Sequence, residues 1–132
     1  VGVIRQSNKI YISKRADDLH QGGKWEFPGG KREANETIEQ ALARELSEEI
    51  GIQVTQQSQF MLIEHDYGDK KVCLDVRLVE NFEGDPNHQE GKQSQWVDIN
   101  DLDQFTFHDA NKVISDKLMS LEKEQNTKLC FH

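Results

Sequence analysis

The sequence has little of what secreted, membrane-bound or zinc-binding proteins need. Its only cysteines, Cys73 and Cys130, lie far apart and form no C-x-x-C pair, which argues against a zinc ribbon or a disulfide framework. No apolar run approaches the roughly 18 residues of a membrane-spanning helix, and no segment resembles a signal peptide. We therefore expect a cytoplasmic protein with no membrane partner.

Positive charge is also in short supply. The chain has 16 Lys and Arg against 24 Asp and Glu, which gives a formal net charge of -8. Proteins that hold nucleic acid through its phosphates normally carry the opposite sign, so we expect no nucleic-acid polymer as a partner. A small phosphorylated molecule can still bind to a protein of this net charge.

The length of 132 residues suits one domain covering residues 1–132. Hydrophobic periodicity predicts several short strands and two helices. The strands are expected at residues 3–4, 10–12, 60–63, 72–78 and 95–99, with loops at 17–30 and 83–94. This order predicts an α+β or mixed-sheet domain with helices packed on the sheet.

The two predicted helices differ in how clearly the sequence marks them. Residues 37–50 carry Ile38, Leu42, Leu46 and Ile50 at every fourth position, followed by Gly51 as a stop. A second helix should be capped by Asp109, with an apolar stripe made of Val113, Ile114, Leu118 and Leu121. Residues 122–132 then form a flexible tail.

Three carboxylates share one face of the first helix. At 100° per residue, Glu48 and Glu49 fall at about 300° and about 40° from Glu45, so the three border and partly overlap the apolar stripe. Like charges three and four residues apart destabilise a helix, and the neighbouring Arg44 can offset only one of them. Mg²⁺ prefers such oxygen ligands, whereas a set without His or Cys disfavours zinc. The simpler alternative is a solvated acidic face.

The spacing of these residues carries a family resemblance. Gly30, five residues, Glu36, seven residues and then Arg44-Glu45-Leu46-x-Glu48-Glu49-x-Gly51-Ile52 match the signature of the Nudix hydrolases. A random match at one starting position has a chance on the order of 10⁻⁹. The preceding segment, residues 23–31, resembles the Nudix hydrolases that act on 8-oxo-dGTP, and weaker similarity extends from Val1 to about Leu121.

The resemblance implies a fold, a reaction and a metal. The fold is the Nudix fold, a mixed β-sheet sandwiched between α-helices. The reaction is hydrolysis of a nucleoside triphosphate, 8-oxo-dGTP, to 8-oxo-dGMP and pyrophosphate, with Mg²⁺ or Mn²⁺ as the cofactor. Such activity would remove oxidised nucleotides before DNA replication, and we expect the protein to act as a monomer.

The resemblance also implies roles for individual residues. Glu45, Glu48, Glu49, Glu90 and the carbonyl of Gly29 would hold metal, and Arg44 would orient Glu45. Both Glu45 and Glu90 are candidates for the general base.

Three further residues would contact the substrate. Asn111 would read the purine edge, since an amide offers both donor and acceptor, although Asn is also common in the first turn of a helix. Arg15 would contact the nucleotide, and Phe27 would offer backbone groups to the base or serve as a core aromatic. His108 and Asp109 stand where the similar hydrolases carry prolines.

Other functions stay open on the sequence alone. The Nudix signature does not fix the substrate, so ADP-ribose or a dinucleotide polyphosphate is an alternative. A catalytically silent module that binds metal or nucleotide is another, but it would be expected to have lost signature acids. An interaction domain with a solvated acidic helix is the weakest alternative. No P-loop, G-x-S-x-G or H-E-x-x-H motif offers a competing mechanism.

Overall fold

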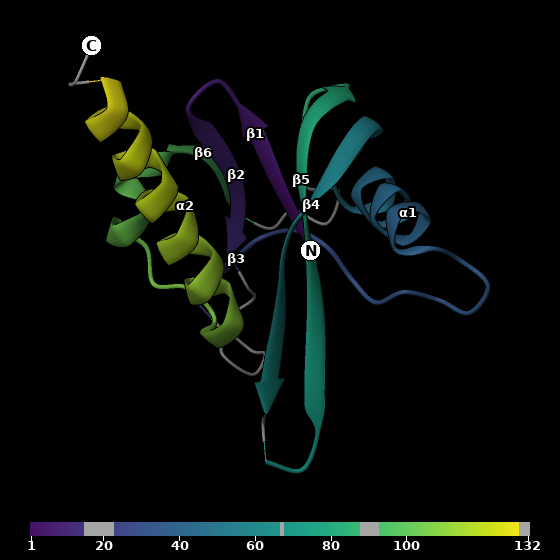
Figure 1. Cartoon of the computed structure of the whole chain (residues 1–132). Coiled ribbons are helices and arrows are strands. Elements are labelled where there is room, and N and C mark those ends of the chain that lie inside the picture. Colours follow the sequence, from purple (N-terminus) through teal and green to yellow (C-terminus); the bar gives the residue numbers. More distant parts are fainter. Residues whose placement is uncertain (15–22, 67, 88–92, 130–132) are drawn as a thin grey trace.

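The computed structural model describes residues 1–14, 23–66, 68–87 and 93–129. Two long helices lie on opposite sides of the strands (Figure 1). The elements in chain order are β1 (Gly2–Gln6), β2 (Lys9–Lys14), β3 (Trp25–Glu26), α1 (Ile38–Ile50), β4 (Gln53–Asp66), β5 (Lys71–Glu83), β6 (Ser94–Asp98), the 3₁₀ helix η1 (Ile99–Gln104) and α2 (Asp109–Leu129).

The strands form one mixed sheet. Its six strands have the order β3-β2-β1-β5-β4, and β6 pairs with β2. The β1–β5 pairing is parallel, with Val3 opposite Leu78, whereas the other strand pairs are antiparallel. A parallel neighbour needs a crossover, and here the chain passes through α1 between β1 and β5. The predicted mixed sheet between helices is confirmed.

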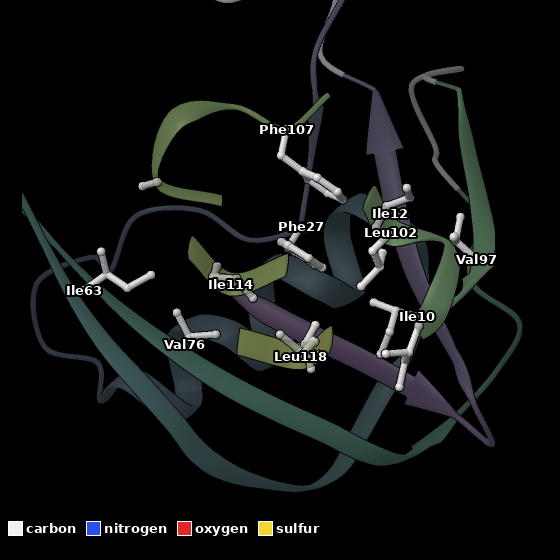
Figure 2. Packing of buried hydrophobic residues seen from close by; sticks show 13 residues of the cluster. Ile10, Ile12, Phe27, Ile63, Val76, Val97, Leu102, Phe107, Ile114 and Leu118 are labelled. Atoms are coloured by element: carbon white, nitrogen blue, oxygen red, sulfur yellow. The ribbon is translucent and has the colours of Figure 1, made fainter. Parts of the chain in front are cut away.

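Each face of the sheet is buried under one helix. Because side chains alternate along a strand, Val3 joins the cluster under α2 while Ile4 joins the cluster under α1. Figure 2 shows the first cluster, where Ile114 and Leu118 of α2 lie over residues of the sheet. The second cluster holds Leu42, Leu46 and Ile50 from α1, the stripe that the sequence predicted.

The first helix has the expected limits, whereas the second extends beyond them. α1 is confirmed, with Thr37 as its N-cap and Gly51 as its C-cap. α2 begins at Asp109 itself, and Val113, which was predicted to lie in its apolar stripe, is 45% exposed. The helix also continues to Leu129, beyond the start of the predicted tail at Glu122, because Glu, Lys and Gln favour helix without any apolar stripe.

The predicted strands are present, but the sequence underestimated some of them. β4 runs from Gln53 to Asp66 rather than over 60–63, since its first half is polar and gives no apolar signal. The predicted loop 17–30 contains the short strand β3, which pairs Trp25 with Lys14. Within the described ranges, no helix is long and apolar enough to cross a membrane.

Candidate active site

Local capping fixes where the acidic helix begins. The Gln40 amide donates to the Thr37 hydroxyl at 3.1 Å, and the Thr37 amide donates to the Gln40 side chain at 2.9 Å. This reciprocal capping box satisfies two of the donors that a helix N-terminus leaves free. At the other end, Gly51 takes the left-handed conformation (φ 72°) and its amide donates to Ser47. The carboxylates between these caps are therefore held on a well-defined helix.

Arg44 is the centre of an ion-pair network. Its guanidinium donates to both oxygens of Glu36, at 2.7 and 3.2 Å, and to Glu45 at 2.9 Å and Glu48 at 3.4 Å. It also donates to the carbonyl of Lys31 at 3.2 Å, so it ties the loop before α1 to the helix. The hydrogen bond from Arg44 lowers the pKa of Glu36, and the same bond raises the pKa of Arg44. Glu36, which also belongs to the signature, thus anchors Arg44 to the loop before the helix.

Glu45 lies directly beneath a glycine turn. A Cβ added to Gly30 would stand 2.5 Å from the Cδ and Oε2 atoms of Glu45, a distance that no side chain permits. The Glu45 side chain is only 17% exposed. Gly29, whose carbonyl the resemblance assigns to metal, is in the same turn with φ 150°. Glycine at position 30 therefore lets this turn approach the carboxylate.

The carboxylates of α1 do not form a ready-made metal cage. Among the residues that the structure describes, no three His, Cys, Asp or Glu side chains converge as a metal site. Two of the carboxylates, those of Glu45 and Glu48, form ion pairs with Arg44 instead of converging on one point. The Glu48 side chain is 63% exposed. The donor set still fits a hard divalent ion, because Mg²⁺ commonly takes one or two carboxylates and completes its shell with water and phosphate oxygens.

The glycine turn also lines a cavity of about 640 Å³. It is bounded by the turn, by the hairpin of β4 and β5, and by the start of α2. Its lining includes Glu26, Phe27, Gly29, Gly30, Lys31, Lys70, Val72, Leu74, His108 and Asn111. A volume of this size suits a nucleotide-sized ligand.

Asn111 and Phe27 meet at the wall of this cavity. The Phe27 amide donates to Oδ1 of Asn111 at 3.0 Å, although the two residues are 84 positions apart. Asn111 is 8% exposed, and the Phe27 ring stacks on Phe107 at a centroid distance of 5.1 Å (Figure 2). The Phe27 ring thus belongs to the core, and the residue also lines the cavity.

The structure brings several of the predicted site residues together. Phe27, Asn111, Gly29 and Gly30 share one cavity, and Glu45 contacts the same turn. Arg15 and Glu90 lie outside the described residues. Lys31, Lys70 and His108 also line the cavity but were not predicted, since no spacing pattern distinguishes them from other exposed polar residues.

Comparison with known proteins places the chain in a family. The sequence profile of the NUDIX domain matches residues 1–117. The chain is 43% identical to the 8-oxo-dGTP diphosphatase of Escherichia coli over 122 residues, which cover 92% of this chain and 95% of that protein. It is 29% identical to the CTP pyrophosphohydrolase of the same organism over 90% of this chain and 88% of that protein.

A solved structure gives the same result in three dimensions. A MutT structure from work on the Aliivibrio salmonicida and Vibrio cholerae proteins superposes with a TM-score of 0.82 and 43% identity, covering 91% of this chain and 94% of that one. That structure and this chain therefore share one fold over most of their length. The chain belongs to the Nudix family.

Proposed function

We infer that this chain hydrolyses 8-oxo-dGTP to 8-oxo-dGMP and pyrophosphate. Support comes from the relatives of that activity, which include a protein 46% identical over 91 residues from Proteus vulgaris as well as the Escherichia coli protein. The observation that carries the inference is the shared glycine turn. Gly29 and Gly30 line the cavity that holds Asn111, and Gly30 also lies close to the Glu45 carboxylate.

The amide of Asn111 supports recognition of a guanine-type base. Its Oδ1 atom accepts from the Phe27 amide, which leaves the two N–H donors of Nδ2 to face a ligand. A donor suits the O6 carbonyl of guanine, whereas the amino group of adenine would face it as a second donor. The site therefore favours an oxo group at that purine position.

Discrimination of the oxidised base needs an acceptor. Oxidation at C8 converts N7 from an acceptor into an N–H donor, so a protein that prefers 8-oxoguanine should offer a carbonyl or carboxylate there. The Phe27 amide donates the hydrogen bond that fixes Asn111. We propose that the carbonyl of Phe27 accepts from N7–H of the oxidised base. A site with a fixed acceptor penalises unmodified guanine, because two acceptors would then face one another.

The acidic helix would supply the hydrolytic half of the site. Glu45, Glu48 and Glu49, with Glu90 and the Gly29 carbonyl, would hold Mg²⁺, or Mn²⁺ in its place. Such an ion neutralises phosphate charge and lowers the pKa of a bound water. Arg44 holds Glu45 in place, while Glu45 or Glu90 accepts the proton of the attacking water. We also propose that Arg15, which lies outside the described residues, contacts the nucleotide.

The charge distribution fits a free nucleotide rather than a polymer. The net charge of -8 disfavours DNA and RNA, while the cavity carries Lys31 and Lys70 beside its opening to solvent. Both lysines are exposed and can meet the phosphates of a single nucleotide. We propose that the protein acts as a monomer in the cytoplasm on nucleoside triphosphates.

A substrate panel tests this function against its alternatives. Pyrophosphate release is measured with Mg²⁺ and equal concentrations of 8-oxo-dGTP, CTP and ADP-ribose, the last read as release of AMP. We expect the highest kcat/KM for 8-oxo-dGTP. A higher value for CTP or ADP-ribose would replace the proposed substrate while leaving the family unchanged.

A further inference from the structure

The segment before α2 runs beside β3 like an extra strand. The Trp25 amide donates to the carbonyl of Thr106 at 2.8 Å, and the His108 amide donates to the carbonyl of Trp25 at 2.9 Å. These two bonds make a parallel bridge between Trp25 and Phe107. On its other side, β3 pairs with β2, where Trp25 lies opposite Lys14. The two-residue strand is thus held between two neighbours.

Two aromatic pairs reinforce this bridge. The rings of Trp25 and Phe105 meet edge to face at a centroid distance of 5.2 Å. The rings of Phe27 and Phe107 stack at 5.1 Å with an interplanar angle of 6°, and Figure 2 shows both in the cluster under α2. Phe27 is 4% exposed and Phe107 is 6% exposed. Two stacked rings in a close-packed core have little freedom to shift relative to one another.

The two groups proposed to read the base come from these two stacked segments. The Phe27 amide donates to Oδ1 of Asn111, and the Phe27 carbonyl is the proposed acceptor for N7–H. Asn111 follows Phe107 by four residues, and its amide donates to the carbonyl of His108 at 2.8 Å. Phe107 therefore fixes Phe27 through its ring and fixes the start of α2 through the chain.

We propose that Phe107 is a positioning residue that sets the preference for the oxidised base. The proposal rests on the proposed function, because it takes 8-oxoguanine as the base in the cavity. Phe107 acts through Phe27 and Asn111, since its stack on Phe27 keeps the acceptor and the donor of the site at a fixed separation. Hydrogen bonds weaken steeply when their distance and angle change, so a small shift of Phe27 against Asn111 reduces the discrimination. Leucine at position 107 would stay apolar but would lose the stack.

Competition between 8-oxo-dGTP and dGTP in one reaction measures this preference independently of stability. At equal concentrations the ratio of the two product rates is a ratio of kcat/KM values, so the amount of folded enzyme cancels. We expect Phe107→Leu to lower the wild-type ratio by about two- to tenfold, the range for the loss of one aromatic pair. Leu118→Ala is the matched control, because Leu118 is buried in the same cluster but lies two turns beyond Asn111 on α2. It should lower stability and leave the ratio unchanged.

Amide hydrogen exchange in the ligand-free protein gives a second readout that requires no substrate. Phe107→Leu should speed exchange of the Phe27 amide by at least about twofold relative to the slowest amides of the sheet, which report global unfolding. Leu118→Ala should speed both kinds of amide alike. If Phe107→Leu does not fold, Phe107→Met supplies the same comparisons with a more adaptable apolar side chain.

Three results would overturn the proposal. They are a Phe107→Leu variant that keeps the wild-type ratio, a Leu118→Ala variant that loses as much of it, and a Phe27 amide that keeps its relative protection in Phe107→Leu. Failure of the proposed function gives a different result, a ratio near one in the wild-type chain itself, and the role of Phe107 in selectivity then falls with it.

Discussion

Asn111 shows how one buried amide can be oriented by the fold before a ligand arrives. The amide of Phe27 occupies its oxygen, and the residue is 8% exposed. A rigid donor costs less ordering on binding than a mobile one, which favours both affinity and selectivity. The sequence predicted the residue and its role but could not give this orientation, because the donor comes from a position 84 residues away.

Replacing Asn111 tests this assignment. Asn111→Ala should lower kcat/KM for 8-oxo-dGTP by roughly 10- to 100-fold, since the Phe27 amide loses its partner along with the base. The loss on dGTP should be smaller, so the preference for the oxidised base falls. Kinetics on both nucleotides give the answer, and an equal loss on the two would contradict base recognition by Asn111.

Glu49 tests the acidic helix. Glu49→Gln keeps the size of the side chain and removes its charge. Loss of a residue that only hydrogen-bonds to a metal ligand typically lowers activity by about 10- to 100-fold. Loss of a proposed ligand should cost more, so we expect turnover to fall by more than about a hundredfold. The melting temperature should hold or rise, because a like-charge contact is relieved.

Glu39→Gln is the matched control, since it removes the same charge from the same helix at a residue that pairs with Arg77 instead. It should keep nearly full activity. Full activity of Glu49→Gln would exclude this carboxylate from the mechanism.

At the scale of elements, the turn at Gly29 and Gly30 touches both halves of the proposed site. The turn lines the nucleotide cavity and also rests on Glu45, while Arg44 ties the loop that follows it to α1. We therefore expect a displacement of this turn to alter both the cavity and the position of Glu45. Gly30 and Glu45 are fifteen positions apart in the chain, and the fold of the loop and the capped helix brings them together.

Gly30→Ala tests this contact. The added methyl group would meet the carboxyl end of Glu45, a flexible group that can swing aside, so the free energy of unfolding should change by less than about 1 kcal/mol. Activity should fall by at least about tenfold because Glu45 leaves its position. Thermal melting and kcat are measured together, and unchanged kcat would show that the position of Glu45 is not critical.

The same element shows what the sequence could and could not predict. The four-residue period and Gly51 fixed the limits of α1, and the Nudix spacing identified Arg44, Glu45, Glu48 and Glu49. The network around Arg44 was less predictable, since its shortest contact is to Glu36 in the preceding loop. Val113 was wrongly placed in the stripe of α2, because a valine in an amphipathic helix gives the same signal on the rim of the buried face as at its centre.

At the scale of the whole molecule, the sheet divides the core into two clusters. The cluster under α1 packs the helix that carries the carboxylates against the sheet, and the cluster under α2 does the same for the helix that carries Asn111. The parallel strands β1 and β5 lie within the sheet between the two clusters. The order of strands was not predictable from the sequence, because the same alternating pattern suits several neighbours.

Adjacent positions on α2 test how far the base site depends on the core. Ile114 is fully buried, and Ile114→Ala should lower the free energy of unfolding by about 2–5 kcal/mol. Val113→Ala is the matched control on the same helix, and a change within about 0.5 kcal/mol is expected there. Denaturant unfolding measures both, and equal effects would contradict the packing of α2 described above.

The central claim is that the molecule selects the oxidised nucleotide. It is tested most directly by competition, with 8-oxo-dGTP and dGTP at equal concentration in one reaction with Mg²⁺ and both monophosphate products separated and quantified. The orientation of Asn111 and the acceptor at Phe27 predict that 8-oxo-dGMP forms at least about tenfold faster than dGMP. Equal rates of formation of the two products would contradict the account.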